Sequence, residues 1–332
     1  MKKILMLAMG GTIASEISEH GLRPGLGPEQ ILSYVPEISK LCEVDTKCLY
    51  SIDSTNTTPK HVLHCAKVIE ENYADYDGFV ITHGTDTLAY TAAILSYLIQ
   101  ASKKAIILTG AQKPIHFADT DSRINLYDAF LAATSDKVRG VNIVFNGNVI
   151  NGTRARKIRS KNYNAFASIN YPMVATIHDR YISAFIEQDY LEKPKFYHEL
   201  EENINLVKLL PNNDTSLLRY AFEESTAVII ESFGVGGLPR YPNDPLDQAL
   251  KDFLKAGKFL VMSTQTPLEG SDMGVYSVGY DLKFEENILE AYDMTTEAVF
   301  AKLMWILAQT KDVHEVRKLF YTPVANDIYP HK

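Results

Sequence analysis

The sequence predicts an α/β fold with a larger N-terminal sheet of mostly parallel strands, helices on both faces of that sheet, and a smaller C-terminal α/β domain. Short apolar runs alternate with helix-period segments through the first half of the chain, and a second such series begins near residue 203. The 332 residues, 46% of them hydrophobic, suffice for two packed cores. We expect an N-terminal domain over 1–178, a linker over 179–202 and a C-terminal domain over 203–332.

Four apolar runs predict the strands of the N-terminal domain, at Ile4–Ala8, Gly78–Thr82, Ala105–Thr109 and Val141–Phe145. Helices are expected between them, at Pro28–Tyr34, Pro59–Asn72, Leu88–Gln100 and Asp121–Thr134. The second of these helices has the clearest start, because the Thr57 and Thr58 hydroxyls can cap it and Pro59 lies in its first turn.

The segment from 179 to 202 is charged, weakly periodic and interrupted by Lys193-Pro194-Lys195, which is typical of a linker. Beyond it we expect three strands, at Asn205–Leu209, Ala227–Ile230 and Phe259–Met262. Four helices complete this series, at Ser216–Glu223, Pro245–Ala256, Thr295–Leu307 and Val313–Tyr321.

Composition restricts the partners and the compartment. Lys and Arg number 33 against 41 Asp and Glu, and a net charge of −8 argues against a nucleic-acid partner. No stretch approaches the roughly 20 apolar residues of a membrane span, so we expect no membrane partner. The apolar run after Met1 is too short for a signal peptide. Three cysteines without a CxxC pattern fit a reducing cytoplasm, which is the expected location.

Two glycine-containing turns place a threonine at the exit of a predicted strand. Met9–Ser15 (MGGTIAS) follows the first strand and contains Thr12, and His83–Thr87 (HGTDT) follows the second and contains Thr85. Parallel α/β sheets bind ligands at this edge, and glycine lets the backbone approach them closely. Two hydroxyls and a carboxylate together suit a nucleophile with its activating partners. Taken singly, each turn could also be a helix cap.

Two further polar segments supply candidate partners. The stretch from 148 to 162 is basic, and most of its five cations suit a solvated hairpin. Lys157 differs if it lies beside Asp86 and Thr85. It could then hold the carboxylate ionised or take a proton from a threonine. The cluster from Asp53 to Thr58 either forms an Asx or ST turn before the Pro59 helix or supplies hydroxyls for the carboxylate of a small zwitterion.

Several other chemistries lack their motifs. The chain has no GxSxG elbow, Gly234–Pro239 breaks the GxGxxG pattern at its last position, and no Walker lysine follows a glycine loop. His61 and His64 are three residues apart, but no cysteine or carboxylate pattern completes a metal site around them. We therefore expect no metal site.

With these motifs, the sequence resembles the bacterial-type L-asparaginases and most of all their cytoplasmic type I branch. The matching segments are MGGTIAS at 9–15, DST at 53–55, GFVITHGTDTLAYTA at 78–92, TGAQ at 109–112, GTRARK at 152–157, AFASINYP at 165–172, ESFGVGG at 231–237 and DMTTEA at 293–298. The resemblance implies cofactor-free hydrolysis of the small molecule L-asparagine to L-aspartate and ammonia. It also implies a homodimer or homotetramer with sites at subunit contacts, for which Tyr276, Tyr280 and Tyr292 offer aromatic anchors.

Carried over by position, the resemblance implies a role for each site residue. Thr12 becomes the nucleophile, and Thr85, Asp86 and Lys157 become a second catalytic group. The expected substrate contacts are Asp53, Ser54, Thr55, Asp86 (which takes the α-amino group) and Ala111. Backbone N–H groups at Gly11 and Thr85 are the expected oxyanion donors. Two other amidase specificities stay open, a glutaminase-asparaginase and a D-amino-acid amidase, because one methylene is worth only about 1–3 kcal/mol in a pocket.

One position departs from the family pattern. The family carries a tyrosine after the first threonine that activates it, and the matching position here is Leu22, which cannot transfer a proton. Either the Thr85-Asp86-Lys157 group or a tyrosine from elsewhere must then activate Thr12; alternatively, the chain is a catalytically weak asparagine-binding sensor. Glycines 21, 25 and 27 suit a mobile lid in this segment.

Overall fold

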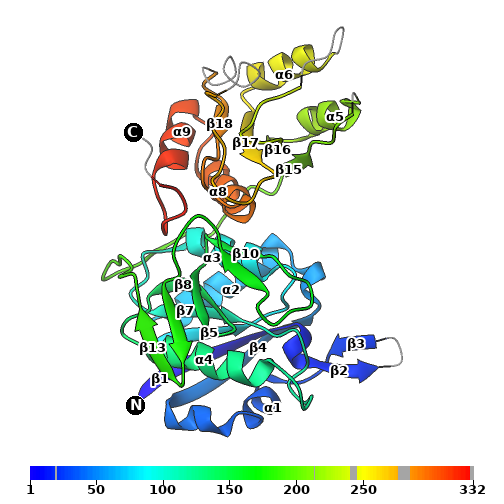
Figure 1. Cartoon of the computed structure of the whole chain (residues 1–332). Coiled ribbons are helices and arrows are strands. Elements are labelled where there is room, and N and C mark those ends of the chain that lie inside the picture. Colours follow the sequence, from blue (N-terminus) through cyan, green and yellow to red (C-terminus); the bar gives the residue numbers. More distant parts are fainter. Residues whose placement is uncertain (19–20, 213, 240–244, 276–284, 330–332) are drawn as a thin grey trace. The chain divides into compact units, whose positions relative to one another are not determined.

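The structure is a computed structural model that describes residues 1–18, 21–212, 214–239, 245–275 and 285–329. The chain forms two compact units, Met1–His198 and Glu199–Lys332, whose folds are drawn in Figure 1. The division falls inside the range expected for a linker, but residues 179–198 of that range belong to the first unit.

An eight-stranded sheet organises the first unit, in the order β13-β12-β9-β8-β7-β5-β1-β4. Its strands are β1 (Lys2–Gly10), β4 (Cys42–Ile52), β5 (Gly78–Thr82), β7 (Ala105–Thr109), β8 (Gly140–Phe145), β9 (Asn148–Asn151), β12 (Ala175–His178) and β13 (Tyr181–Ala184). The five strands from β4 to β8 in this order are parallel, and β9, β12 and β13 add antiparallel pairs at one end. The mostly parallel sheet and its four predicted strands are confirmed.

Helices cover both faces of this sheet. They are α1 (Pro28–Ser33), α2 (Pro59–Asn72), α3 (Leu88–Leu98) and α4 (Ser122–Thr134), and three short 3₁₀ helices are η1 (Thr12–Ala14), η2 (Pro36–Lys40) and η3 (Ser54–Asn56). Ile4, Met6 and Val80 belong to the core that α1 and α4 cover. Every residue of β5 is buried, as expected for a central parallel strand covered on both faces. Figure 1 shows α4 on the near side of the sheet and α2 behind it.

Strands that lie at edges or in short ribbons were not predicted from the sequence. β4 carries alternating charged residues and is only partly buried, which hides it from a search for apolar runs. Three two-stranded ribbons complete the unit: β2 (Ser15–Ser18) with β3 (Gly21–Pro24), β10 (Ala155–Lys157) with β11 (Phe166–Ser168), and β6 (Ile99–Gln100) with β14 (Lys195–Phe196).

The linker expected over 179–202 is wrong for its first part. Asp179 and Arg180 form the turn of the β12–β13 hairpin, with φ angles of 48° and 67°, and β14 pairs with β6. The positive φ angles at two successive residues suit a tight hairpin. Charged turn residues and exposed edge strands gave the segment its linker-like composition.

The second unit contains a four-stranded parallel sheet in the order β15-β16-β17-β18. Its elements are β15 (Ile204–Lys208), α5 (Ser216–Glu224), β16 (Ala227–Ser232), α6 (Leu246–Lys255), β17 (Phe259–Thr264), β18 (Ile288–Glu290), α8 (Thr296–Gln309) and α9 (Val313–Tyr321). The smaller α/β domain is therefore confirmed, and β18 is the strand that the sequence did not predict. Within the described ranges, no helix is long and apolar enough to cross a membrane.

The three tyrosines expected as anchors between copies of the chain are only partly described. Tyr276 and Tyr280 lie outside the described residues. Tyr292 is half-buried, its ring centroid lies 5.9 Å from that of Tyr321, and burial raises its pKa to about 12. Tyr292 thus contributes to the packing of its own unit.

Candidate active site

Three turns meet at the carboxyl edge of the large sheet, and glycines allow the contact. A Cβ added to Gly11 would lie 2.3 Å from the backbone nitrogen of Gly84, and one added to Gly84 would lie 2.5 Å from the Ser54 hydroxyl oxygen. Gly11 also has a φ of 81°, which disfavours other residues. The turns that carry Thr12, Ser54 and Thr85 therefore contact one another directly.

Thr12 begins η1 in a turn that the backbone fixes. The Gly11 N–H donates to the Ile52 carbonyl at 3.0 Å, and the Ser15 hydroxyl donates to the Gly11 carbonyl at 3.0 Å. Thr12 is half-buried, and its hydroxyl makes no hydrogen bond to any described residue. The Gly11 N–H is thus already used, which contradicts its expected role as an oxyanion donor. The N–H of Thr12 has no internal partner in the described chain, as at other helix starts.

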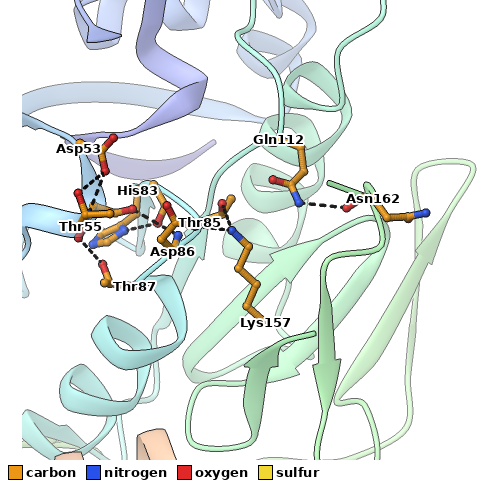
Figure 2. A network of polar contacts seen from close by, with 11 residues as sticks. Asp53, Thr55, His83, Thr85, Asp86, Thr87, Gln112, Lys157 and Asn162 are labelled. Carbon is orange, nitrogen blue, oxygen red and sulfur yellow. Dashed lines mark hydrogen bonds and ion pairs between the residues drawn. The ribbon is translucent and has the colours of Figure 1, made fainter. Parts of the chain in front are cut away.

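Lys157 joins the second threonine to its neighbouring carboxylate. Its Nζ lies 2.8 Å from the Thr85 hydroxyl oxygen and 2.6 Å from the Asp86 Oδ1 (Figure 2). The lysine comes from β10, so the short β10–β11 ribbon carries it to the sheet edge. Thr85 is buried and the Lys157 side chain is 18% exposed, whereas that of Asp86 is 57% exposed. In this geometry the amine donates to both oxygens.

A buried histidine makes hydrogen bonds that fix the HGTDT turn. The Nδ1 of His83 lies 2.7 Å from the Gly84 carbonyl oxygen, and its Nε2 lies 3.0 Å from the Thr91 hydroxyl oxygen. Burial lowers the pKa of His83 to about 4, so the ring is neutral at pH 7. Because a carbonyl only accepts, Nδ1 carries the proton and Nε2 accepts from Thr91. His83 was not predicted to have a role of its own, although its position between an apolar strand and a glycine was a signal.

The segment from Asp53 to Thr55 forms the Asx turn that was one of its two interpretations. The Asp53 Oδ1 accepts hydrogen bonds from the Thr55 N–H and hydroxyl, both at 2.9 Å. Ser54 is buried and links this turn to the next one: its carbonyl accepts from the Thr87 hydroxyl at 2.8 Å, and its Oγ accepts from the Asp86 N–H at 3.3 Å. Asp53 and Thr55 are exposed beside this link (Figure 2).

Ala111 lies in the neighbouring turn after β7 and is fully buried. A Cβ added to Gly110 would lie 2.3 Å from the His83 carbonyl oxygen, so this turn packs closely on the HGTDT turn. Protein encloses the whole residue, backbone included, so Ala111 is not open to a ligand in this structure. Next to it, the Gln112 side-chain amide donates to the Asn162 carbonyl at 3.1 Å, which ties the turn to the basic segment.

Leu22 lies in the hairpin that follows Thr12. It pairs with Ile17 across β2 and β3, and the two side chains are 48% and 73% exposed. The hairpin extends from the body of the unit in Figure 1. No hydrogen bond joins a tyrosine to the Thr12 hydroxyl within the described residues.

Comparisons with known proteins match both halves of the chain. The model of the asparaginase N-terminal domain matches residues 3–189, and that of the glutaminase/asparaginase C-terminal domain matches residues 203–320. The L-asparaginase of Thermococcus kodakarensis is 34% identical over 98% of this chain and 99% of its own length. Its solved structure covers the same shares of both chains with a TM-score of 0.92.

Two more relatives, whose names describe activities that differ from each other, also match the whole chain or nearly all of it. L-asparaginase 1 of Escherichia coli K12 is 32% identical over 99% of this chain and 98% of its own length. One component of the glutamyl-tRNA(Gln) amidotransferase of Pyrococcus abyssi is 31% identical over 100% of this chain and 78% of its own length. The two domain models together match most of the chain, and the full-length relatives include L-asparaginases, so the chain belongs to the asparaginase family.

Proposed function

We propose that this chain hydrolyses the side-chain amide of L-asparagine to L-aspartate and ammonia. The observation that carries the proposal is the Lys157 amine placed 2.8 Å from the Thr85 hydroxyl and 2.6 Å from the Asp86 carboxylate, beside the turn of Thr12. The full-length relatives named L-asparaginase support the choice of substrate. No step of the reaction as proposed needs a cofactor.

Thr12 is the proposed nucleophile. Its hydroxyl oxygen attacks the amide carbon while its proton passes to the Thr85 oxygen, and the carbonyl oxygen becomes an oxyanion. As the oxyanion collapses, the C–N bond breaks, and the nitrogen takes a proton from Thr85 and leaves as ammonia. Water attacks the resulting ester, which releases L-aspartate and restores the Thr12 hydroxyl. The backbone N–H groups of Thr12 and Thr85 are the proposed oxyanion donors, because the Gly11 N–H is bonded to Ile52.

The Thr85-Asp86-Lys157 group is proposed to move the protons. Lys157 donates to the Thr85 oxygen, so the Thr85 hydroxyl proton is directed away from the lysine and toward a bound substrate. Thr85 can then pass a proton to the departing nitrogen and later orient the attacking water. Asp86 balances the charge of Lys157 and keeps it in place.

The exposed part of the site is proposed to recognise the two ends of the amino acid. The Asp86 carboxylate would pair with the α-amino group, and the Ser54 hydroxyl, whose oxygen accepts from the Asp86 N–H, would donate to the α-carboxylate. The Thr55 hydroxyl already donates to Asp53, so Thr55 would shape the turn beside the α-carboxylate. Asp53 acts here through Thr55, because its Oδ1 holds both the N–H and the hydroxyl of that residue. Ala111, which is fully buried, would shape the turn beside the substrate rather than contact it.

Glutamine is the second candidate substrate, favoured by the match to a glutaminase/asparaginase C-terminal domain. An ammonia-release assay with L-asparagine, L-glutamine and D-asparagine at neutral pH separates the candidates. We expect L-asparagine to give the highest kcat/KM. Faster release from D-asparagine would indicate the D-amidase, and unhydrolysed L-asparagine that stays bound for hours would indicate the sensor and contradict the proposal.

We also propose that the enzyme is a homodimer or homotetramer in the cytoplasm. The family resemblance supports the assembly. All three cysteines, Cys42, Cys48 and Cys65, are free thiols, which agrees with a reducing compartment.

A further inference from the structure

The first unit contains a cavity that none of the threonine turns lines. Its volume is about 490 Å³. Its walls come from the segment around η2, from the first two turns of α4, and from the end of β12 with the turn that follows. The side chains that give it chemical character are Tyr34, Glu37, Arg123, Tyr127, Asp128 and Arg180. Lys157 is not among the lining residues either, so the cavity is separate from the site described above.

Asp128 is the unusual group of this cavity. Only 6% of its surface is exposed, and in the described chain its carboxylate makes neither a hydrogen bond nor an ion pair. Burial raises the pKa of Asp128 to about 7, so half of the molecules carry the charge near neutral pH. A buried carboxylate without a partner is unfavourable, and a cation that enters the cavity would satisfy it.

Two arginines hold positive charge on the same walls. The Arg180 guanidinium lies 4.7 Å from the Tyr127 ring centroid, and that of Arg123 lies 5.8 Å from the Tyr34 ring centroid. Arg123 is fixed further by hydrogen bonds from its Nε and Nη2 to backbone carbonyls at 3.2 and 3.4 Å. Arginine held by stacking keeps its remaining N–H groups for carboxylate or phosphate oxygens.

The charged side chains that line the cavity with Asp128 determine which kind of cationic ligand it can accept. Glu37 faces the cavity from η2, Arg123 from α4, and His178, Asp179 and Arg180 from the β12–β13 turn. The two arginines would repel a ligand with a second positive charge and attract one with an acid group. The acids do not gather for a metal ion, since the described residues contain no group of three or more His, Cys, Asp or Glu side chains that could hold one.

We propose that this cavity binds a small zwitterion, whose ammonium group pairs with Asp128 and whose acid group pairs with Arg180 and the Nη1 of Arg123. The proposal does not depend on the reaction at the threonine turns. Because Asp128 must be ionised to bind the ammonium group, affinity should fall as the pH drops through 7. The fall should be about tenfold between pH 8 and pH 6.

Calorimetry on the full chain tests the proposal with ω-amino acids from glycine to 6-aminohexanoate at pH 8 and pH 6. The longer probes lack the paired α-groups of the proposed substrate. We expect one of them to bind, and the amine and the acid of the same chain length to bind at least about tenfold more weakly, since each lacks one ion pair. Failure of the whole series to bind below about 10 mM, or an amine that binds as tightly as its zwitterion, would overturn the proposal.

Asp128→Asn keeps the shape of the side chain and removes its charge. We expect this variant to bind the best probe at least about tenfold more weakly and to lose the pH dependence, while ammonia release stays at the wild-type rate. Glu37→Gln is the matched control, since it removes another carboxylate of the same cavity, and it should leave affinity within about threefold. Wild-type affinity in Asp128→Asn would refute the assignment, and affinity of the wild type that does not change between pH 8 and pH 6 would refute it even if the variant does not fold.

Discussion

At the scale of single residues, the proposed site depends on hydrogen bonds that fix polar groups before a substrate arrives. Lys157 holds the Thr85 hydroxyl and the Asp86 carboxylate in one geometry, and His83 holds the Gly84 carbonyl just before them. Such preorganised groups stabilise a transition state without having to reorient during the reaction. The types of these side chains could be predicted from two short motifs, whereas the part played by His83 required knowledge of its burial.

Replacing Lys157 should separate catalysis from binding. Lys157→Met removes the donor to Thr85 and leaves Asp86 without its cation, so we expect kcat for ammonia release to fall by about a hundredfold or more, with a smaller change in KM. Arg159→Met is the matched control, because Arg159 belongs to the same basic stretch, is exposed, and its guanidinium donates only to the Asn164 carbonyl among the described residues. Its kcat should stay within about twofold. Equal losses in the two variants would indicate a general charge effect.

Acid should weaken the first unit through His83. Its folded pKa of about 4 lies below the ordinary value of 6.5, so the folded state prefers the neutral ring. This contribution to stability is fully present above pH 6.5 and is lost as the pH falls toward 4, by about 3 kcal/mol in all. Denaturant unfolding of the wild type and of His83→Gln between pH 7 and pH 4 measures it as a difference.

The comparison with His83→Gln is needed because Asp128 changes stability with pH in the opposite direction to His83. Its raised pKa of about 7 means that protonation on acidification favours the folded state. Both proteins share Asp128, so its contribution cancels in the comparison. Parallel stability curves for the wild type and His83→Gln would show that His83 does not titrate in this way.

At the scale of elements, buried strands were predictable and edge strands were not. β5 and β7 are apolar at nearly every position because helices cover both faces, and such runs are visible in any sequence. β4 alternates charged and apolar residues, and β10 spans three residues of a basic stretch. The short β10–β11 ribbon therefore positions Lys157. The contacts of Lys157 with Thr85 and Asp86, 72 and 71 residues away in the sequence, are long-range contacts that local sequence patterns do not contain.

The β2–β3 hairpin offers a test of how Thr12 is activated. If the family tyrosine acts through its hydroxyl, Leu22→Tyr should raise kcat for ammonia release by several-fold or more while KM changes little. Leu22→Phe is the control, because it adds the ring without the hydroxyl. Equal rates in the two variants would mean that this position contributes only apolar contact, which would leave activation to the Thr85-Asp86-Lys157 group.

At the scale of the whole molecule, alternating strands and helices predicted two α/β sheets in the right order. The two observed units divide at His198 and Glu199, within the range expected for the linker, although the hairpin at β12 and β13 extends the first unit beyond the expected boundary of 178. Composition alone could not separate an exposed edge hairpin from a linker, because both are polar and both tolerate charged residues.

The assembly is also a property of the whole molecule. We expect light scattering at micromolar concentration to give at least twice the chain mass of 37.2 kDa. Dilution should lower the mass and the specific activity together if the sites lie at subunit contacts. A fully active monomer would contradict the proposed assembly.

The role of Thr12 is the central claim of the proposed mechanism, and the rate of ammonia release by Thr12→Ala tests it most directly. The side chain is half-buried in a surface turn, so its truncation should change stability by less than about 1 kcal/mol. Thr12→Ser, which keeps a hydroxyl, serves as the control. We predict that Thr12→Ala loses at least about a thousandfold in kcat with L-asparagine while Thr12→Ser keeps measurable turnover. A folded Thr12→Ala protein that retains more than about a tenth of the wild-type kcat would show that Thr12 is not the nucleophile.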